Sequence, residues 1–135
     1  MQQRDDELEA LASLVVDCGF HIHKEFGPGL LESVYEAVLA NRLESKCLKI
    51  DRQKPVGIEV DGIVLNEGFR ADLLVEDKLL IELKSIEKLA PVHGKQTLTY
   101  LRLMNLPLGL LINFGGSTFR EGVKRIANNY QGFVS

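Results

Sequence analysis

Two apolar segments separated by three turn residues constrain the fold more than any other feature of this sequence. Phe69–Val75 and Leu79–Leu83 both alternate, so that one apolar set falls on one face of a strand and the charged residues fall on the other. Burying both apolar sets together fixes the register of a hairpin whose loop is Glu76-Asp77-Lys78. In that register Asp72 lies opposite Glu82, with Cβ atoms about 4.5–5.5 Å apart.

Two carboxylates at opposed positions of a hairpin destabilise it unless a positive charge lies between them. Lys84, two residues beyond Glu82 on the same face, is one candidate for that charge. A divalent cation is the other, since Mg²⁺ binds one or two carboxylates together with water and phosphate oxygens. The alternative is an exposed hairpin face on which both carboxylates are solvated beside Lys84.

Apolar residues with three- and four-residue spacing predict helices around this hairpin. These helices run over Asp5–Phe26, Leu30–Ser45 and Val92–Asn105. The buried face of the first is expected to carry Leu8, Leu11, Val15, Cys18 and Ile22. Gly27-Pro28-Gly29 separates the first helix from the second, and a further helix is expected over Glu121–Tyr130.

The remaining apolar segments predict strands. Val56–Val60 and Ile63–Leu65 flank Asp61-Gly62, a strong two-residue hairpin signal. Leu108–Phe114 is almost entirely apolar, as a strand covered on both faces is, and a short strand is expected at Thr118–Arg120. The order of two helices, a β-meander, a helix and a strand predicts one α/β domain over residues 1–135.

Three polar residues fall inside the apolar arcs of the predicted helices. At 100° per residue they are Glu32, His93 and Gln96. Their neighbours on the arcs are Leu39 and Leu43 for Glu32, Tyr100 and Met104 for His93, and Tyr100 and Leu103 for Gln96. One inward polar group is usually a core residue with a hydrogen-bond partner. Three of them together with an acidic hairpin favour a shared site.

The overall charge restricts the kind of nucleic-acid protein that this chain can be. Its net charge of −3 and isoelectric point of about 5.6 argue against a protein that coats nucleic acid by bulk charge. The stretch 84–102 nevertheless holds four basic residues against one acid. The basic residues are Lys84, Lys88, Lys95 and Arg102. This stretch is either a local nucleic-acid contact or an ordinary solvated helix face.

The sequence shows no targeting or membrane segment. No apolar run approaches the ~18 residues that a membrane span needs, and the polar, acidic start MQQRDDELEA is unlike a signal peptide. Cys18 and Cys47 lack the spacing of metal ligands, so we expect reduced, packed thiols. A cytoplasmic protein without a membrane partner is the expectation.

Four short motifs occur in an order that resembles a known family. Gly29-Leu30-Leu31-Glu32-Ser33-Val34-Tyr35 resembles the pattern that names the GxxExxY proteins. Ala71-Asp72 followed by Glu82-Leu83-Lys84 resembles the PD-(D/E)XK nuclease signature, with alanine in place of its proline. Gln96-Thr97-Leu98-Thr99-Tyr100 resembles the QxxxY element of the RecB-type exonuclease branch. Leu110-Leu111-Ile112-Asn113-Phe114-Gly115 resembles the closing strand of the family.

The resemblance implies a restriction-endonuclease-like core of order α-βββ-α-β, a mixed central sheet flanked by helices, with a Mg²⁺ or Mn²⁺ site at one sheet end. Asp72 and Glu82 would be metal ligands, and the carbonyl oxygen of Leu83 would add another. Lys84 would orient or activate the attacking water, and Glu32 would bind the metal directly or through water. This chemistry suits phosphodiester hydrolysis, because the metal polarises the phosphoryl oxygen and lowers the pKa of bound water.

The remaining candidate residues would position the site or the nucleic-acid backbone. The resemblance gives this role to Gln96 and Tyr100, and His93 and Tyr35 complete the candidate set. We expect the side chain of Gln96 to point toward the acidic cluster.

A metal-dependent nuclease acting on nucleic acid, with DNA favoured over RNA, is the expected function. The acidic net charge favours an alternative, a non-catalytic nucleic-acid-binding or protein-assembly module that retains the fold. Hydrolysis of another phosphoester is a third possibility. A homodimer is also expected, because one domain of 135 residues has limited surface for gripping a duplex and twofold partners are common.

Overall fold

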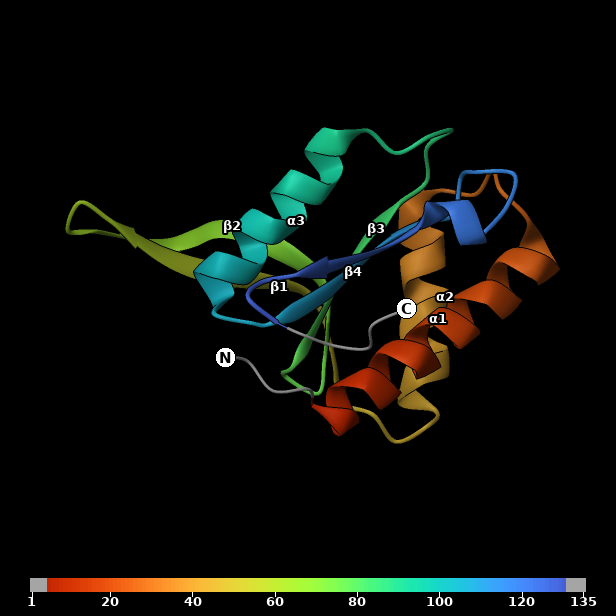
Figure 1. The fold of residues 1–135 in the computed structure, drawn as a ribbon, viewed down its shortest axis with the longest axis horizontal. Helices are drawn as coiled ribbons and strands as arrows, with labels where there is room; N and C mark the ends of the chain where they lie inside the picture. Colours follow the sequence, from red (N-terminus) through yellow and green to blue (C-terminus); the bar gives the residue numbers. More distant parts are fainter. Residues whose placement is uncertain (1–4, 131–135) are drawn as a thin grey trace.

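A five-stranded sheet lies at the centre of the protein, with helices against both of its faces (Figure 1). The computed structural model describes residues 5–130. The helical elements are α1 (Asp6–Phe26), α2 (Glu32–Glu44), α3 (Pro91–Met104) and the 3₁₀ turn η1 (Arg120–Gly122). The strands are β1 (Ile50–Val60), β2 (Ile63–Val75), β3 (Leu79–Lys84), β4 (Leu108–Asn113) and β5 (Val123–Ala127). None of the described helices is long and apolar enough to cross a membrane.

The strands lie across the sheet in sequence order, β1-β2-β3-β4-β5. Neighbouring strands are antiparallel except β3 and β4, which are parallel. The crossover between these two runs through α3, which packs on the opposite face from α1 and α2 (Figure 1). The predicted mixed α/β sheet with flanking helices is confirmed.

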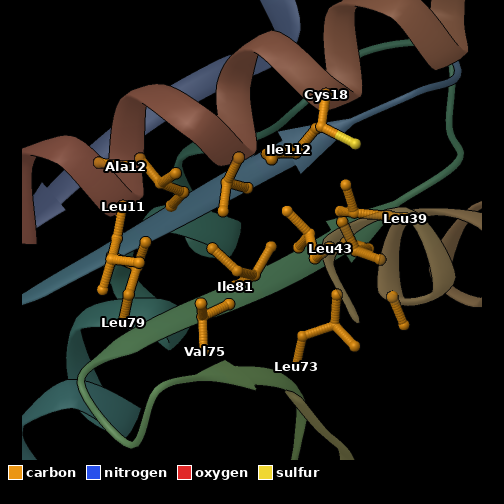
Figure 2. Close-up of a cluster of buried hydrophobic side chains, with 14 of the residues drawn as sticks. Leu11, Ala12, Cys18, Leu39, Leu43, Leu73, Val75, Leu79, Ile81 and Ile112 are labelled. Carbon is orange, nitrogen blue, oxygen red and sulfur yellow. The ribbon is translucent and has the colours of Figure 1, made fainter. Parts of the chain in front are cut away.

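Two hydrophobic clusters hold the helices to the sheet. In the larger one, side chains from α1, α2, β2, β3 and β4 point toward one another (Figure 2). It contains every residue predicted for the buried face of α1: Leu8, Leu11, Val15, Cys18 and Ile22. A smaller cluster of Ala71, Leu80 and Leu101 fixes α3 on the other face. Burial of each large aliphatic side chain contributes about 1.5–3 kcal/mol, so these contacts set the position of the helices.

Two tight turns set the strand registers as predicted. Asp61 and Gly62 have left-handed backbone angles (φ 51° and 77°), which match the twist of a two-residue hairpin. Glu76 and Asp77 (φ 53° and 55°) turn β2 into β3, so that Val75 pairs with the first residue of β3. Both predicted hairpins are therefore present.

The strands of the first hairpin are longer than predicted. Val56–Val60, Ile63–Leu65 and Phe69–Val75 belong to two continuous strands that pair from Ile50↔Val75 to Val60↔Ile63, with an irregularity beside Gly57. Gly68 belongs to this irregularity, where residues 66–68 of β2 lie opposite Gly57 alone. A Cβ at Gly68 would lie 2.7 Å from the Ile58 side chain of the partner strand, so only glycine lets the two strands approach there.

The prediction for the C-terminal part of the chain is wrong. Residues 120–127 form η1 and β5, instead of a strand at Thr118–Arg120 and a helix at Glu121–Tyr130. β5 pairs antiparallel with β4, from Ile112↔Val123 to Leu108↔Ala127. Because β4 is buried along its whole length, an unpaired edge would leave buried backbone amides and carbonyls without partners. The cost of leaving the β4 backbone unpaired exceeds what residues 121–130 would gain by forming a helix.

The outer half of the β1–β2 hairpin projects away from the rest of the sheet (yellow-green ribbon, Figure 1). The ladder between β2 and β3 covers only Leu73 to Val75, so residues 56–68 form a ribbon of two strands, which we call the arm. Its large exposed apolar residues are Val60 (48%), Ile63 (60%), Val64 (71%) and Leu65 (44%).

Candidate active site

The acidic pair lies where β2 and β3 separate. Leu73 pairs with Ile81, which places Asp72 beside Glu82 as the alternation predicts. The regular ladder ends there, and two backbone amides donate to side-chain carboxylates instead of to backbone carbonyls. The Asp72 amide donates to Glu82 Oε2 (2.9 Å), and the Leu83 amide donates to Asp72 Oδ2 (2.8 Å). Each carboxylate is therefore fixed by the backbone of the neighbouring strand, and both lie between the two strands.

Glu82 is a buried carboxylate beside a second acid. It is only 7% exposed, and burial, followed by the charge of Asp72, raises its pKa to about 8. Within residues 5–130, no lysine, arginine or histidine forms an ion pair with it. At neutral pH this side chain is mostly protonated, and a bound cation would replace the proton.

Lys84 supplies positive charge to the cluster from the end of β3. Its residue pairs with Asn113 of β4, and its carbonyl accepts the Phe114 amide (2.8 Å), so its backbone is held by the parallel strand. Its ammonium lowers the pKa of Glu82 and of Glu32, against the larger opposing effect of burial on each. Lys84 therefore shares an electrostatic environment with both acids.

Glu32 borders the acidic pair, but the predicted burial of its side chain is wrong. It is the first residue of α2 and is exposed, whereas the core contacts of this helix begin at Tyr35. Glu32 shares a helix face with Leu39, but at the first turn of α2 this face is not covered by the core. Desolvation and then the charge of Asp72 raise the pKa of Glu32, which places its carboxylate within electrostatic reach of the pair.

The three acids do not form a ready-made metal cage. In the described part of the chain, no group of three or more His, Cys, Asp or Glu side chains is arranged to hold a metal ion. Asp72 and Glu82 nevertheless fit Mg²⁺ or Mn²⁺ in their donor chemistry, since such ions need only one or two carboxylates besides water and phosphate oxygens. Leu83, the residue after Glu82, is buried, and its amide donates to Asp72 Oδ2.

A second acid of α2, Glu36, was missed from the sequence. It is 5% exposed and is held by Arg52 Nε (3.1 Å) and by Gln53 Nε2 (2.5 Å), both from β1. Gln53 Nε2 also donates to Asp72 Oδ1 (3.1 Å), so the network reaches the acidic pair. Its spacing could have indicated its burial, because Glu36 precedes Leu39 by three residues and so lies on the same apolar face of the helix.

The two residues that define the QxxxY motif of α3 have different surroundings. Gln96 is exposed, so its predicted place on the buried face is wrong. The face of α3 that meets the sheet is centred on Thr97 and Leu101, whereas Leu103, which had helped to define the predicted arc, is 47% exposed. Tyr100 is half-buried; its pKa is raised by burial and then by the charges of Glu82 and Asp72, so it borders the site. Its ring stacks on Phe69, with ring centroids 3.9 Å apart.

His93 and Tyr35 have structural contacts away from the acidic pair. His93 Nδ1 accepts the Ala90 amide (2.9 Å) and so caps the start of α3. Tyr35 is 1% exposed, stacks on Phe114 and donates its hydroxyl proton to the Gly27 carbonyl (2.5 Å). The Tyr35 hydroxyl thereby fixes the loop that leads into Glu32.

The family model of the PD-(D/E)XK nuclease superfamily matches residues 9–126, which is most of the chain. The chain belongs to the PD-(D/E)XK nuclease superfamily. No curated protein and no solved structure matches it.

The residues that resemble the PD-(D/E)XK signature are Asp72 on β2 and Glu82-Leu83-Lys84 on β3. Backbone amides of the two strands hold the two carboxylates where the regular ladder ends, and Lys84 follows Glu82 on the same strand face. Membership of the superfamily suggests nuclease activity.

Proposed function

We propose that this PD-(D/E)XK domain is a nuclease that hydrolyses phosphodiester bonds with a bound Mg²⁺ or Mn²⁺. The observation that supports this most directly is the state of Glu82. It is a buried carboxylate whose pKa is raised to about 8, next to another carboxylate and without an ion pair among the described residues. Such a group is costly for a purely structural role and suited to binding a divalent cation.

In this proposal Asp72 and Glu82 hold the ion, and the carbonyl of Leu83 contributes a further oxygen. The metal, when bound, polarises the phosphoryl oxygen and lowers the pKa of a bound water. Lys84 orients the attacking water and offsets charge that develops on the phosphate. Glu32, exposed at the start of α2, acts through water at the rim of the site. Tyr100 borders the acids and would position them or the backbone of the substrate.

The proposed substrate is nucleic acid, with DNA favoured over RNA because of the RecB-type resemblance. Three basic residues of the stretch 84–102 are exposed and available to phosphates: Lys88, Lys95 and Arg102. Among subgroups of the superfamily we assign the chain to the GxxExxY proteins and the RecB-like branch. Tyr35, whose hydroxyl holds the loop that leads into Glu32, and Tyr100, which borders the acids, support that assignment, while exposed Gln96 would act only by contacting the substrate. A cytoplasmic location is part of the same proposal.

We also propose that the protein is a homodimer in which the arm contacts the second copy. Isolated two-stranded ribbons are only marginally stable in water, and this one exposes four large apolar residues. Residues 56–68 contain three acids and no lysine or arginine, so phosphate is a poor partner for them. A protein surface is the better match, and a second copy is the partner we propose.

A non-catalytic binding or assembly module is the competing function. The lack of a preformed three-ligand metal group in the described residues favours it. The experiment that decides is a cleavage assay on single-stranded, duplex and branched DNA and on RNA, with Mg²⁺ or Mn²⁺ and with chelator.

The nuclease account predicts metal-dependent cleavage that falls about 10²–10³-fold in Lys84→Ala through lost electrostatic stabilisation. Lys46→Ala, an exposed lysine beyond the far end of α2, is the matched control and should cut like wild type. A panel on which wild type cuts nothing, or on which Lys84→Ala cuts equally well, would establish the binding module instead.

A further inference from the structure

Gln53 occupies an unusual backbone position directly across from the acidic pair. Its flanking residues on β1 pair regularly with β2, Arg52 with Leu73 and Lys54 with Ala71, which leaves Gln53 opposite Asp72. Its own φ is 48°, in the left-handed region that glutamine rarely adopts inside a strand. A strained backbone that persists in the middle of a pairing ladder points to a function for the side chain placed there.

The amide group of Gln53 bridges two carboxylates. Its Nε2 donates to Asp72 Oδ1 (3.1 Å) and to Glu36 Oε1 (2.5 Å). Because both acceptors are carboxylates, the NH₂ edge of the amide must face them, since the opposite edge would bring a third oxygen against two. The two protons of one amide nitrogen therefore fix the relative positions of α2 and β2.

Glu36 gives this bridge a rigid base. It is 5% exposed on α2, and Arg52 binds its Oε2 through Nε (3.1 Å) and Nη2 (3.0 Å). The Glu36 carboxylate is thus neutralised by arginine and still accepts from Gln53. Arg52 holds the Glu36 carboxylate in place independently of Asp72. The carboxylate can therefore fix the position of the Gln53 amide.

The consequence is that both oxygens of Asp72 are oriented by the protein. Oδ2 accepts the Leu83 amide (2.8 Å), and Oδ1 accepts Gln53. Each carboxylate oxygen has a second lone pair, so this arrangement aims the carboxylate without using its capacity for a cation. Partners of this kind, which hold a metal ligand without touching the metal, often set the affinity of the site.

We propose that Gln53, anchored by Glu36, is a positioning residue that orients Asp72 for binding a divalent cation. This inference rests on the proposed metal site of Asp72 and Glu82. It extends the site to β1 and to a second acid of α2, outside the residues that resemble the PD-(D/E)XK signature.

Gln53→Gly is the most informative test, because it separates the side chain from the backbone. Glycine adopts the left-handed conformation without strain, and this gain offsets part of the loss of the two hydrogen bonds, so the variant should stay folded at the temperature of the assay, as its thermal unfolding will report. The dissociation constant for Mn²⁺, measured from the free-ion EPR signal without any substrate, should nevertheless increase about 10–100-fold. Asn105→Gly is the matched control: Asn105 is also left-handed (φ 55°) but caps α3, and its glycine variant should keep wild-type Mn²⁺ affinity.

The inference is overturned if Gln53→Gly binds Mn²⁺ as tightly as wild type, or if it loses affinity only to the extent that it unfolds. Cleavage is assayed in parallel and tests the proposed function separately. If wild type binds Mn²⁺ but cuts nothing, the nuclease proposal fails while the comparison of affinities still supports or overturns the role of Gln53. If wild type binds no Mn²⁺ at all, both are overturned.

Discussion

The inner and outer halves of the β1–β2 hairpin are both rich in apolar residues but have different surroundings. On the inner half, Leu73, Leu74 and Val75 are at most 4% exposed, because β3 and the helices cover them. On the arm, Ile63 and Val64 are at least 60% exposed. Burial here is decided by the third strand and the helices, and not by the apolar pattern of the hairpin itself.

The candidate site lies at the boundary between these halves. Asp72 is the residue after which β2 joins the buried ladder, and its carboxylate accepts a backbone amide of β3 where the ladder ends. The rigid half fixes the position of Glu82, and beyond Leu73↔Ile81 the carboxylates of Asp72 and Glu82 accept backbone amides of the neighbouring strand. The end of a sheet ladder thus gives this site a rigid base and two carboxylates that no longer follow regular strand pairing.

The largest predicted contrast between the halves is in the pH dependence of stability. The pKa of Glu82 is about 8 in the folded protein, well above the ordinary glutamate value of 4.5. A raised folded-state pKa contributes stability that is fully present below the unfolded pKa and is lost as pH rises through the folded one. The free energy of unfolding without metal should therefore fall between about pH 4.5 and pH 8, by on the order of 5 kcal/mol.

Urea unfolding in EDTA at several pH values measures this decrease. Glu82→Gln should remove most of it, whereas Glu59→Gln on the arm, where the side chain is exposed, should leave it in place. An equal pH dependence in wild type and Glu82→Gln would show that the buried acid does not bear this cost.

A second contrast comes from two leucines on the same strand. Leu73 is completely buried and Leu65 is 44% exposed. Leu73→Ala should lower the free energy of unfolding by about 2–5 kcal/mol, because it leaves a cavity between β2, β3 and α2. Leu65→Ala should cost less than about 1 kcal/mol when measured on the monomer. Equal costs from chemical denaturation would show that the arm is packed as tightly as the core.

The smallest effect on folding, but the clearest on assembly, is expected at the tip of the arm. Val64→Asp should change the free energy of unfolding by less than about 0.5 kcal/mol, since Val64 is 71% exposed. In light scattering at micromolar concentration it should convert a dimer into a monomer. Val92→Asp, at a valine of α3 that is 62% exposed, is the control and should remain dimeric. A wild-type protein that is monomeric under these conditions would exclude the proposed dimer.

The spacing of apolar and turn residues predicted the strands and the register of the site, but not the side-chain hydrogen bonds between its elements. The Asp72–Glu82 register followed from alternation and a three-residue loop, because both act over short distances along the chain. The network through Gln53 joins α2 to β1 and depends on how a helix lies on a sheet, which no local pattern contains.

The errors in the sequence-based prediction have the same origin. Gln96 was assigned to the buried face of α3 because Leu103 was counted as a core residue, and that leucine proved to be exposed. β5 was predicted as a helix because the apolar spacing of its own residues does not include their pairing with β4, the preceding strand. In both cases the deciding contact is made with another element of the fold.

A crystal structure with bound Mn²⁺ tests the central claim most directly, because anomalous scattering locates the ion without assumptions about its ligands. The account predicts one strong peak between β2 and β3, with an oxygen of Asp72 and an oxygen of Glu82 each about 2.0–2.6 Å away. Mn²⁺ found only elsewhere at saturating concentration, with Asp72 and Glu82 still bound solely to backbone amides, would contradict it.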